Sequence, residues 1–253
     1  MEKVIISKLK EVAAEHTIKM LFACESGSRG WQFASTDSDY DVRFIYTRPY
    51  KYYLSVQERK YDLHFPITDE LDMYGWDIRK VLQLIYKSNT TPFEWLQSPI
   101  VYIQNEEFQK AIWQLCQHYF SQRSNMHHYL GIARGALDAI AQDGEMKIKK
   151  LFYVLRPLLA AKWCWLQNGI APMSIEPLMA ILPTRLQTEV YDLIKIKATA
   201  AESFAITISA GLQSFINDEM SNLQEVAADL EKRYFDVRQL DDFFVQTIIQ
   251  YDY

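Results

Sequence analysis

The sequence predicts an α+β protein, in which a mixed sheet with flanking helices is followed by an all-helical C-terminal domain. Two observations support this prediction. Residues 20–46 contain two apolar runs of strand length on either side of a glycine-containing turn. From about residue 105 onward, apolar residues recur at helical spacing instead. We therefore expect a sheet domain over residues 1–104 and a helical domain over residues 105–253.

The composition is that of a globular chain with an acidic charge balance. Its 253 residues are 49% hydrophobic and 14% aromatic, enough for a sizeable core, and the net charge is −5. This charge argues against broad binding to a nucleic-acid backbone but leaves room for a local basic cleft. No apolar run approaches the ~18 residues of a membrane span, and no signal-peptide pattern is present. Three scattered cysteines in apolar contexts indicate a reducing compartment, so we expect a cytoplasmic protein.

The first elements follow from hydrophobic spacing. Residues 2–16 form an amphipathic helix by their pattern, and residues 20–24 form a short buried strand. The chain then turns at residues 27–30, Gly-Ser-Arg-Gly. A second strand begins with Asp39-Tyr40-Asp41 and ends before Pro49.

Asp39 and Asp41 share one face of the second strand, because successive strand side chains point to opposite faces. Their Cα atoms are roughly 6.5 Å apart, so the carboxylates can chelate one divalent cation or bridge two. Gly27 lets a ligand approach the backbone, and Ser28 offers a hydroxyl beside N–H groups that favour an anion. A phosphate there would lie beside the cations, as phosphoryl transfer requires.

Two arginines accompany this stretch. Arg29 lies inside the glycine turn, where it can touch a phosphate or pair with Glu25. Arg43 shares the face of Asp39 and Asp41, where it lines the site or neutralises the acidic cluster. For both arginines a structural ion pair is an equally good interpretation.

Further elements complete the predicted sheet domain. Residues 60–67 alternate as a third strand that places Asp62 and His64 on one face. An acidic loop follows, and Asp77 is suited to cap the next helix. Residues 100–103 have the pattern of an edge strand. The acidic loop holds Asp69, Glu70 and Asp72.

The remainder of the chain is helical by its pattern, with Ser124 as a cap and Pro157 as a kink or break. No internal repeat or flexible linker interrupts it. The predicted helices cover residues 106–120, 124–142, 147–167, 184–198, 210–232 and 237–249.

Other motifs do not explain the acidic stretch. Asp37, Asp39 and Asp41 alternate as in an EF-hand loop, but Val42 and Arg48 stand where that loop needs Gly and Glu. The turn at 27–30 is neither a P-loop nor a dinucleotide fingerprint. Asp-rich turns are common without any function. The preceding strand and Gly-Ser turn nevertheless favour metal–phosphate chemistry here.

These segments together resemble a known family. A strand, Gly-Ser, a ten-residue spacer and Asp-x-Asp on a second strand are similar to the DNA polymerase β-like nucleotidyltransferase superfamily. The stretch ESGSRGWQFASTDSDYDVRFIY resembles more closely the predicted nucleotidyltransferases known as RlaP, which are associated with RNA repair. The resemblance covers residues 15–165 and fades afterwards. Further similar segments are residues 75–80, 87–89, 94–96, 98–100 and 155–159.

The resemblance implies a polymerase β-like sheet domain and a reaction that needs Mg²⁺ or Mn²⁺. A nucleoside monophosphate would move from an NTP to an acceptor hydroxyl, and pyrophosphate would leave. Asp39 and Asp41 would hold the metal, and Gly27 and Ser28 would cradle the β- and γ-phosphates. By resemblance alone, the acceptor is an RNA end.

The superfamily also carries a third carboxylate on a neighbouring strand, which completes the metal site and helps to remove the acceptor's proton. This chain has His64 where we expect a Glu. Either Asp62 is the third carboxylate and His64 assists it, or His64 replaces the acid as a base. We favour Asp62 as the third catalytic residue and metal ligand, because Mg²⁺ prefers oxygen ligands.

Cationic residues on two helices are predicted nucleotide contacts. Lys80 lies in a segment that resembles the family. Lys149, Tyr153 and Arg156 form a polar stripe on an otherwise apolar helix. A solvated helix face is the more frequent explanation of such a stripe, but the resemblance around Arg156 favours a triphosphate clamp. The predicted nucleotide-binding residues are Gly27, Ser28, Arg29, Arg43, Lys80, Lys149, Tyr153 and Arg156.

Two alternatives stay open. The same fold can place a nucleotide on a protein side chain or a small molecule, which suits the acidic net charge. A catalytically silent nucleotide-binding module is the second alternative, if the third acid is missing. The sequence does not indicate the NTP, the acceptor or the oligomeric state.

Overall fold

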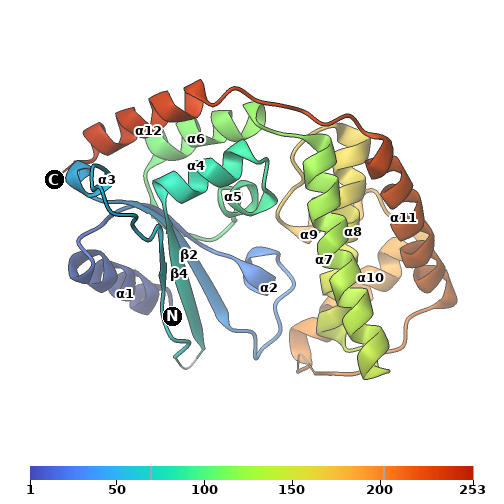
Figure 1. Cartoon of the computed structure of the whole chain (residues 1–253). Coiled ribbons are helices and arrows are strands. Elements are labelled where there is room, and N and C mark those ends of the chain that lie inside the picture. The colour runs from blue at the N-terminus through green and yellow to red at the C-terminus, as the bar shows by residue number, and fades with distance from the viewer. Residues whose placement is uncertain (69, 202, 253) are drawn as a thin grey trace. The chain divides into compact units, whose positions relative to one another are not determined.

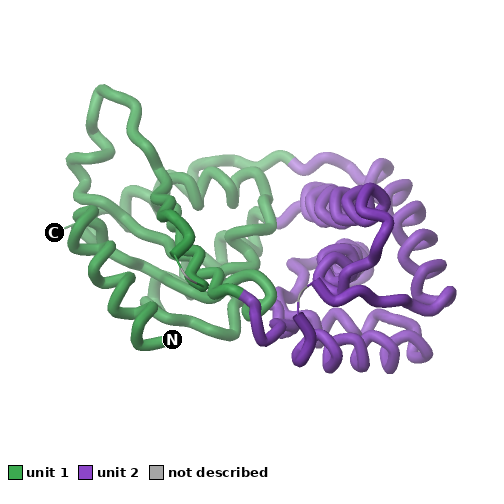
Figure 2. The backbone as a smooth tube through the Cα atoms, turned by 90° about the horizontal axis from the view of Figure 1, so that it is seen from below, with its two compact units in different colours: residues 1–30, 39–119, 234–253 green, residues 31–38, 120–233 purple. Residues whose placement is uncertain are grey.

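A computed structural model describes residues 1–68, 70–201 and 203–252. The chain divides into two compact units, which Figure 2 shows in green and purple. The sheet unit comprises Met1–Gly30, Asp39–Tyr119 and Tyr234–Tyr253. The helical unit comprises Trp31–Ser38 and Phe120–Arg233.

The sheet unit contains a five-stranded mixed sheet with the strand order β3-β4-β2-β1-β5. Figure 1 labels two neighbouring strands of this sheet, β2 and β4. Strands β2 and β4 run parallel, whereas β1–β2, β1–β5 and β3–β4 are antiparallel pairs. The predicted α+β class is confirmed. The strands are β1 (Lys19–Glu25), β2 (Tyr40–Thr47), β3 (Asp62–His64), β4 (Leu71–Asp77) and β5 (Val101–Gln104).

Helices pack against the sheet through apolar side chains. The buried stripe of α1 (Glu2–Glu15) contacts alternate residues of β2 and β4 in one core cluster. Trp76 of β4 points to the opposite face, where Trp95 of α5 (Thr90–Trp95) stacks on it at 4.2 Å between ring centroids. The α1 cluster includes Ile5, Leu9, Val12, Val42, Phe44, Tyr46 and Met73.

Strand β4 is the main departure from the predicted elements. The acidic segment expected to be a loop instead leads into β4, and the expected strand over residues 60–67 shortens to the three residues of β3. Within β4, Leu71 and Met73 alternate with Asp72 and Tyr74, which is the pattern of a half-buried strand. Asp69 lies outside the described residues.

The predicted cap of the next helix is confirmed. Asp77 precedes α4 (Ile78–Tyr86), and its Oδ1 accepts a hydrogen bond from the backbone N–H of Arg79 at 2.9 Å. The predicted edge strand is also present as β5, because β5 pairs only with β1 in the described sheet.

Two helices that we expected in the helical domain belong to the sheet unit, α6 (Glu106–His118) and α12 (Arg238–Gln250). Phe243 of α12 lies 6.0 Å from Phe108 of α6 between ring centroids. Phe244 packs edge-on against Tyr53 of α3 (Tyr50–Tyr53) at 5.2 Å. The compact units therefore differ from the predicted boundary at residue 104, because apolar side chains at the end of the chain return to the sheet unit.

The helical unit is built on two long helices, α7 (Gln122–Asp143) and α8 (Ile148–Gln167). Ser121, and not Ser124, caps α7, since its hydroxyl accepts a hydrogen bond from the backbone N–H of Ser124. Pro157 lies inside α8 without ending it. The other helices are α9 (Ile175–Met179), α10 (Thr184–Thr199) and α11 (Ala210–Asp229).

The buried setting predicted for the three cysteines is confirmed. The side chains of Cys24, Cys116 and Cys164 are buried free thiols. None of the helices in the described part of the chain has the length and apolar character to cross a membrane.

Candidate active site

The turn after β1 brings backbone directly against a carboxylate. Gly27 begins the short helix α2 (Gly27–Gly30) with a φ angle of +54°, which L side chains rarely adopt. A Cβ atom at Gly27 would lie 1.8 Å from Oδ2 of Asp41. Only glycine fits this position without displacing the carboxylate.

Asp41 faces a second carboxylate across two parallel strands. The register of β2 and β4 places Asp72 directly opposite Asp41. Both side chains are partly exposed, at 26% for Asp41 and 29% for Asp72. The sheet therefore presents two acidic groups to solvent side by side, beside the Gly27 turn.

Arg43 holds this pair of carboxylates. Its Nη2 donates to Oδ1 of Asp41 at 2.8 Å and to Oδ2 of Asp72 at 2.7 Å. Its Nη1 donates to the backbone oxygen of Asp72 at 2.8 Å, and its guanidinium lies 3.9 Å from the centroid of the Tyr74 ring. Arg43 is 7% exposed, so its buried guanidinium neutralises and orients both carboxylates on the same face of the sheet.

Glu25 is a buried acid, for which the sequence indicated only a pairing with Arg29. Its Oε1 accepts a hydrogen bond from the backbone N–H of Asp41 at 2.7 Å, and Tyr102 donates its hydroxyl to Oε2. Burial raises the pKa of Glu25, although the hydrogen bonds from Tyr102 and Asp41 oppose the shift. Glu25 thus fixes the first residues of β2.

Asp39 and Arg29 lie at the entrance to β2. Asp39 is exposed and precedes the strand by one residue. Its backbone oxygen accepts a hydrogen bond from Nε of Arg29 at 3.2 Å, and the Arg29 guanidinium lies 4.0 Å from the Tyr40 ring centroid. Arg29 therefore braces the start of the strand. The metal-binding role of Asp39 and the phosphate-binding role of Arg29 and the buried Ser28 stay predictions.

Asp62 and His64 share one face of β3, as expected, but β3 is not the strand beside β2. Asp62 pairs with Trp76 of β4, which in turn pairs with Ile45 of β2. Ile45 is four residues beyond Asp41, a separation of about 13 Å along the strand alone. The expectation that Asp62 lies on the strand next to Asp41 is therefore wrong, because β4 occupies that place.

Asp62 forms a polar cluster of its own. Its Oδ2 lies 2.7 Å from Nε2 of His64, and its Oδ1 lies 3.7 Å from Nζ of Lys80. The His64 ring stacks on Tyr74 at 5.3 Å between centroids. Lys80 is also 5.1 Å from the Trp76 ring centroid. Asp62, His64 and Lys80 therefore each have a partner within this cluster.

The predicted clamp residues on α8 belong to the helical unit. Arg156 is 3% exposed, its Nε donates to the backbone oxygen of Met173 at 3.0 Å, and its guanidinium lies 4.8 Å from the Trp31 ring centroid. Tyr153 packs edge-on against Trp31 at 5.4 Å. Lys149 is partly exposed on the same helix. Tyr153 and Arg156 thus contact the spacer before β2, which is the segment Trp31–Ser38 of the helical unit. Their role as a triphosphate clamp stays a prediction.

The spacer has further anchors in the helical unit. Phe33 stacks on Phe152 at 5.0 Å between ring centroids. The backbone N–H of Ile175 donates to the Trp31 oxygen at 3.0 Å, and Nζ of the fully buried Lys197 donates to the Ser35 hydroxyl at 2.7 Å. The spacer between the glycine turn and Asp41 is therefore structured by contacts remote in sequence.

The donor set suits a hard divalent cation. Among the described residues, no three His, Cys, Asp or Glu side chains gather as a metal centre. Mg²⁺ is usually held by one or two protein carboxylates together with substrate phosphates and water. Asp41 and Asp72 supply two such carboxylates side by side, and the Gly27 backbone lies directly against the Asp41 carboxylate.

Comparison with known proteins identifies the family. Residues 1–246 match RlaP, described as the RNA repair pathway DNA polymerase beta family. The chain belongs to the RlaP family. This confirms the predicted resemblance, and the RlaP match extends beyond residue 165 to include both compact units. The family name points to the polymerase β-like nucleotidyltransferases, an enzyme class associated here with RNA repair.

A relative of similar length supports the membership in RlaP. The chain is 35% identical over 251 residues to the "Uncharacterized protein YcgL" of Bacillus subtilis (strain 168). The aligned region covers 98% of this chain and 96% of the relative. Both units are therefore shared with that protein.

Proposed function

We propose that this protein is a metal-dependent nucleotidyltransferase that moves a nucleoside monophosphate from an NTP to an acceptor hydroxyl. The observation that carries the proposal is the placement of Asp41 opposite Asp72, with the Gly27 backbone against the Asp41 carboxylate. Two fixed carboxylates beside a turn that only glycine fits combine the requirements for a cation and for a phosphate.

Each residue of the site has a proposed role. Asp41 and Asp72 hold Mg²⁺ or Mn²⁺, with Asp39 at the entrance as a further ligand, and Gly27 and Ser28 cradle the β- and γ-phosphates. When bound, the cation neutralises charge on the phosphate oxygens. Arg43 and Glu25 orient the carboxylates through the hydrogen bonds described above.

The reaction forms a bond between the acceptor oxygen and the α-phosphorus. The bond from the α-phosphorus to the pyrophosphate oxygen breaks, and pyrophosphate leaves. Asp72 accepts the proton of the acceptor hydroxyl, in place of Asp62, because Asp72 is the acid opposite Asp41. The RNA repair description of the family supports an RNA end as the acceptor.

Labelling with each α-³²P-NTP tests the proposal, with Mg²⁺ or Mn²⁺ and with either cellular RNA or cellular protein as acceptor. We expect labelled RNA. Asp41→Asn and Asp72→Asn should each lower the rate at least ~100-fold, as removal of a key electrostatic group does. Asp62→Asn is the matched control, and it should keep most of the activity.

Other outcomes identify the alternatives. Labelled protein in place of RNA would change the acceptor and keep the reaction. Loss in Asp62→Asn with full activity in Asp72→Asn would return the third acid to Asp62. If no NTP yields label with either metal, the protein is a silent nucleotide-binding module and the proposal fails.

A further inference from the structure

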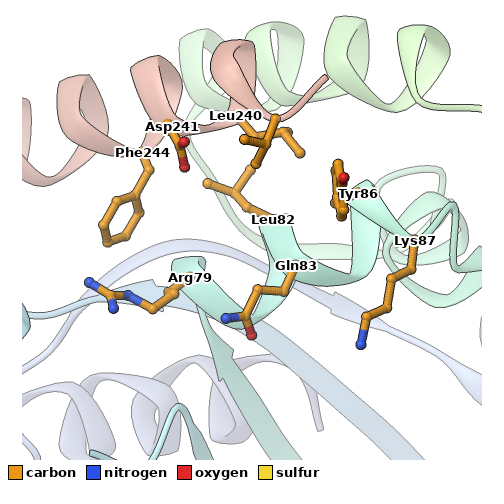
Figure 3. A pocket seen from close by; sticks show the side chains of 9 residues that line it. Arg79, Leu82, Gln83, Tyr86, Lys87, Leu240, Asp241 and Phe244 are labelled. Carbon is orange, nitrogen blue, oxygen red and sulfur yellow. The ribbon is translucent and has the colours of Figure 1, made fainter. Parts of the chain in front are cut away.

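A cavity of about 540 Å³ lies between α4 and α12 of the sheet unit (Figure 3). Its volume falls within the range of small-molecule pockets, roughly 300–1,000 Å³. The residues that line it lie on α4 and α12, apart from Lys87, just after α4, and Val237, just before α12. The carboxylate pair and the glycine turn contribute none of them, so this cavity is separate from the candidate active site.

Arg79 lines the cavity and is partly exposed. Its Nε is buried and has no hydrogen-bond partner within the described residues. Aromatic faces attract a guanidinium but do not accept hydrogen bonds from its edge in the way that carboxylate or phosphate oxygens do. The rings around the guanidinium are Tyr53 at 5.4 Å, Tyr61 at 5.2 Å and Phe244 at 4.9 Å from their centroids.

The acid next to Arg79 is already engaged. Oδ1 of Asp77 accepts the backbone N–H of Arg79, and Oδ2 accepts the Tyr53 hydroxyl at 2.9 Å. A guanidinium that is partly buried without a bonded acid favours an anionic partner from outside. Arg79 therefore marks one end of the cavity as an anion-binding position.

The middle of the cavity is apolar. Leu82 of α4 and Leu240 of α12 face each other there, and they are 4% and 3% exposed (Figure 3). Lys87 adds a second cation at the other end of α4, and Asp241 adds one carboxylate from α12. With two cations against one acid, the lining favours an anion that also has apolar surface.

We propose that this cavity binds a small organic anion with an apolar body. The anionic group pairs with the Arg79 guanidinium, and the body lies against Leu82 and Leu240. Aromatic carboxylates or sulfonates and mononucleotides share this chemistry, and competition distinguishes them.

Fluorescence titration with 8-anilinonaphthalene-1-sulfonate, an apolar body with one sulfonate, tests the proposal on the full chain without NTP. We expect one saturable site. Arg79→Gln should weaken binding by about 10-fold or more, as the loss of a charged hydrogen bond does. Gln83→Trp places a ring at an exposed position of the lining and should abolish binding without disturbing the core. Asp241→Asn should tighten binding, since it removes a charge of the same sign as the probe.

Controls separate this site from the active site. Lys110→Gln changes an exposed lysine of α6 outside the lining and should leave the affinity unchanged. Displacement of the dye by AMP, and not by inorganic phosphate, would assign the site to mononucleotides.

Unchanged affinity in both Arg79→Gln and Gln83→Trp would overturn the proposal. Tighter dye binding in Asp41→Asn with no change in Asp241→Asn would also overturn it, because the dye would then lie beside the carboxylate pair. Because no step requires nucleotide transfer, this result is independent of the proposed activity.

Discussion

Oε1 of Glu25 on β1 accepts a hydrogen bond from the backbone N–H of Asp41 on β2, with 2.7 Å between oxygen and nitrogen. The two strands form an antiparallel pair. Glu25 is fully buried, and its second oxygen accepts the Tyr102 hydroxyl. The position of the proposed metal ligand thus depends on an acid that itself faces away from solvent.

Glu25→Ala should destabilise the fold by about 3 kcal/mol, because it leaves the Asp41 N–H and the Tyr102 hydroxyl without their acceptor. Glu25→Gln should cost less than about 1 kcal/mol, since its amide oxygen still accepts from Asp41 and its amide nitrogen can donate to Tyr102. Urea unfolding of both variants measures the difference. Equal losses in the two variants would mean that the charge of Glu25 matters more than its hydrogen bonds.

Gly27→Ala should destabilise the protein by about 3 kcal/mol, because it combines a left-handed backbone with a Cβ at 1.8 Å from the Asp41 carboxylate. Gly135→Ala is the matched control, since a Cβ there meets no atom within 4 Å on the surface of α7. The control should gain about 0.5–1 kcal/mol from helix propensity. Thermal unfolding of both variants tests the pair. An unchanged stability in Gly27→Ala would contradict the close contact between Gly27 and the Asp41 carboxylate.

Asp77 should make stability depend on pH. Burial raises the pKa of Asp77 to about 6, although hydrogen bonds from Arg79 and Tyr53 oppose the shift. The unfolded chain has a value near 3.9, so the folded state binds the extra proton between about pH 4 and pH 6. Asp77 therefore contributes about 3 kcal/mol to the free energy of unfolding below about pH 4, and this contribution is lost as the pH rises through 6.

Asp77→Asn keeps an N-cap acceptor and removes the charge. Relative to the wild type, the variant should gain stability above pH 6 and show no gain below pH 4. Urea unfolding at a series of pH values measures this gap between the free energies of unfolding of the variant and the wild type. A gap that stays constant across the series would show that the carboxyl does not titrate with a raised pKa.

Phe33→Ala should destabilise the helical unit by about 3–5 kcal/mol, although Phe33 belongs to the spacer before β2. Phe33 is 2% exposed and stacks on Phe152 of α8. Hydrogen exchange of the α8 amides measures the loss, and Phe204→Ala, which truncates a 49% exposed ring, is the control. Faster exchange confined to β1 and β2, with α8 unchanged, would assign the spacer to the sheet unit.

Several predictions from the sequence depend only on local pattern, and the structure agrees with them. The apolar spacing of residues 2–16 predicted α1, and Asp77 caps α4 as its position before an apolar stripe indicated. The apolar runs on either side of the Gly-Ser turn predicted two strands, and these are β1 and β2. Each of these features depends on residues that are close together in the sequence, which is why periodicity and turn chemistry predict them.

The neighbour of Asp41 was decided by tertiary structure. The alternation of residues 71–77 was a usable signal for a strand, but the acidic residues before it favoured a loop. Pairing with β2 depends on the parallel register, which joins segments about thirty residues apart and has no local signature. As a result, Asp72 replaced Asp62 as the acid opposite Asp41.

The sequence by itself determined the α+β class and the family, and it predicted the glycine turn with Asp39 and Asp41 as the centre of the candidate site. Only the tertiary structure decided that Arg43 clamps Asp41 to Asp72, that Arg156 is buried against Trp31, and that α6 and α12 join the sheet unit. The physical reason is the same in each case. A charged or apolar side chain takes its role from the partner that burial brings to it, and that partner comes from a distant part of the chain.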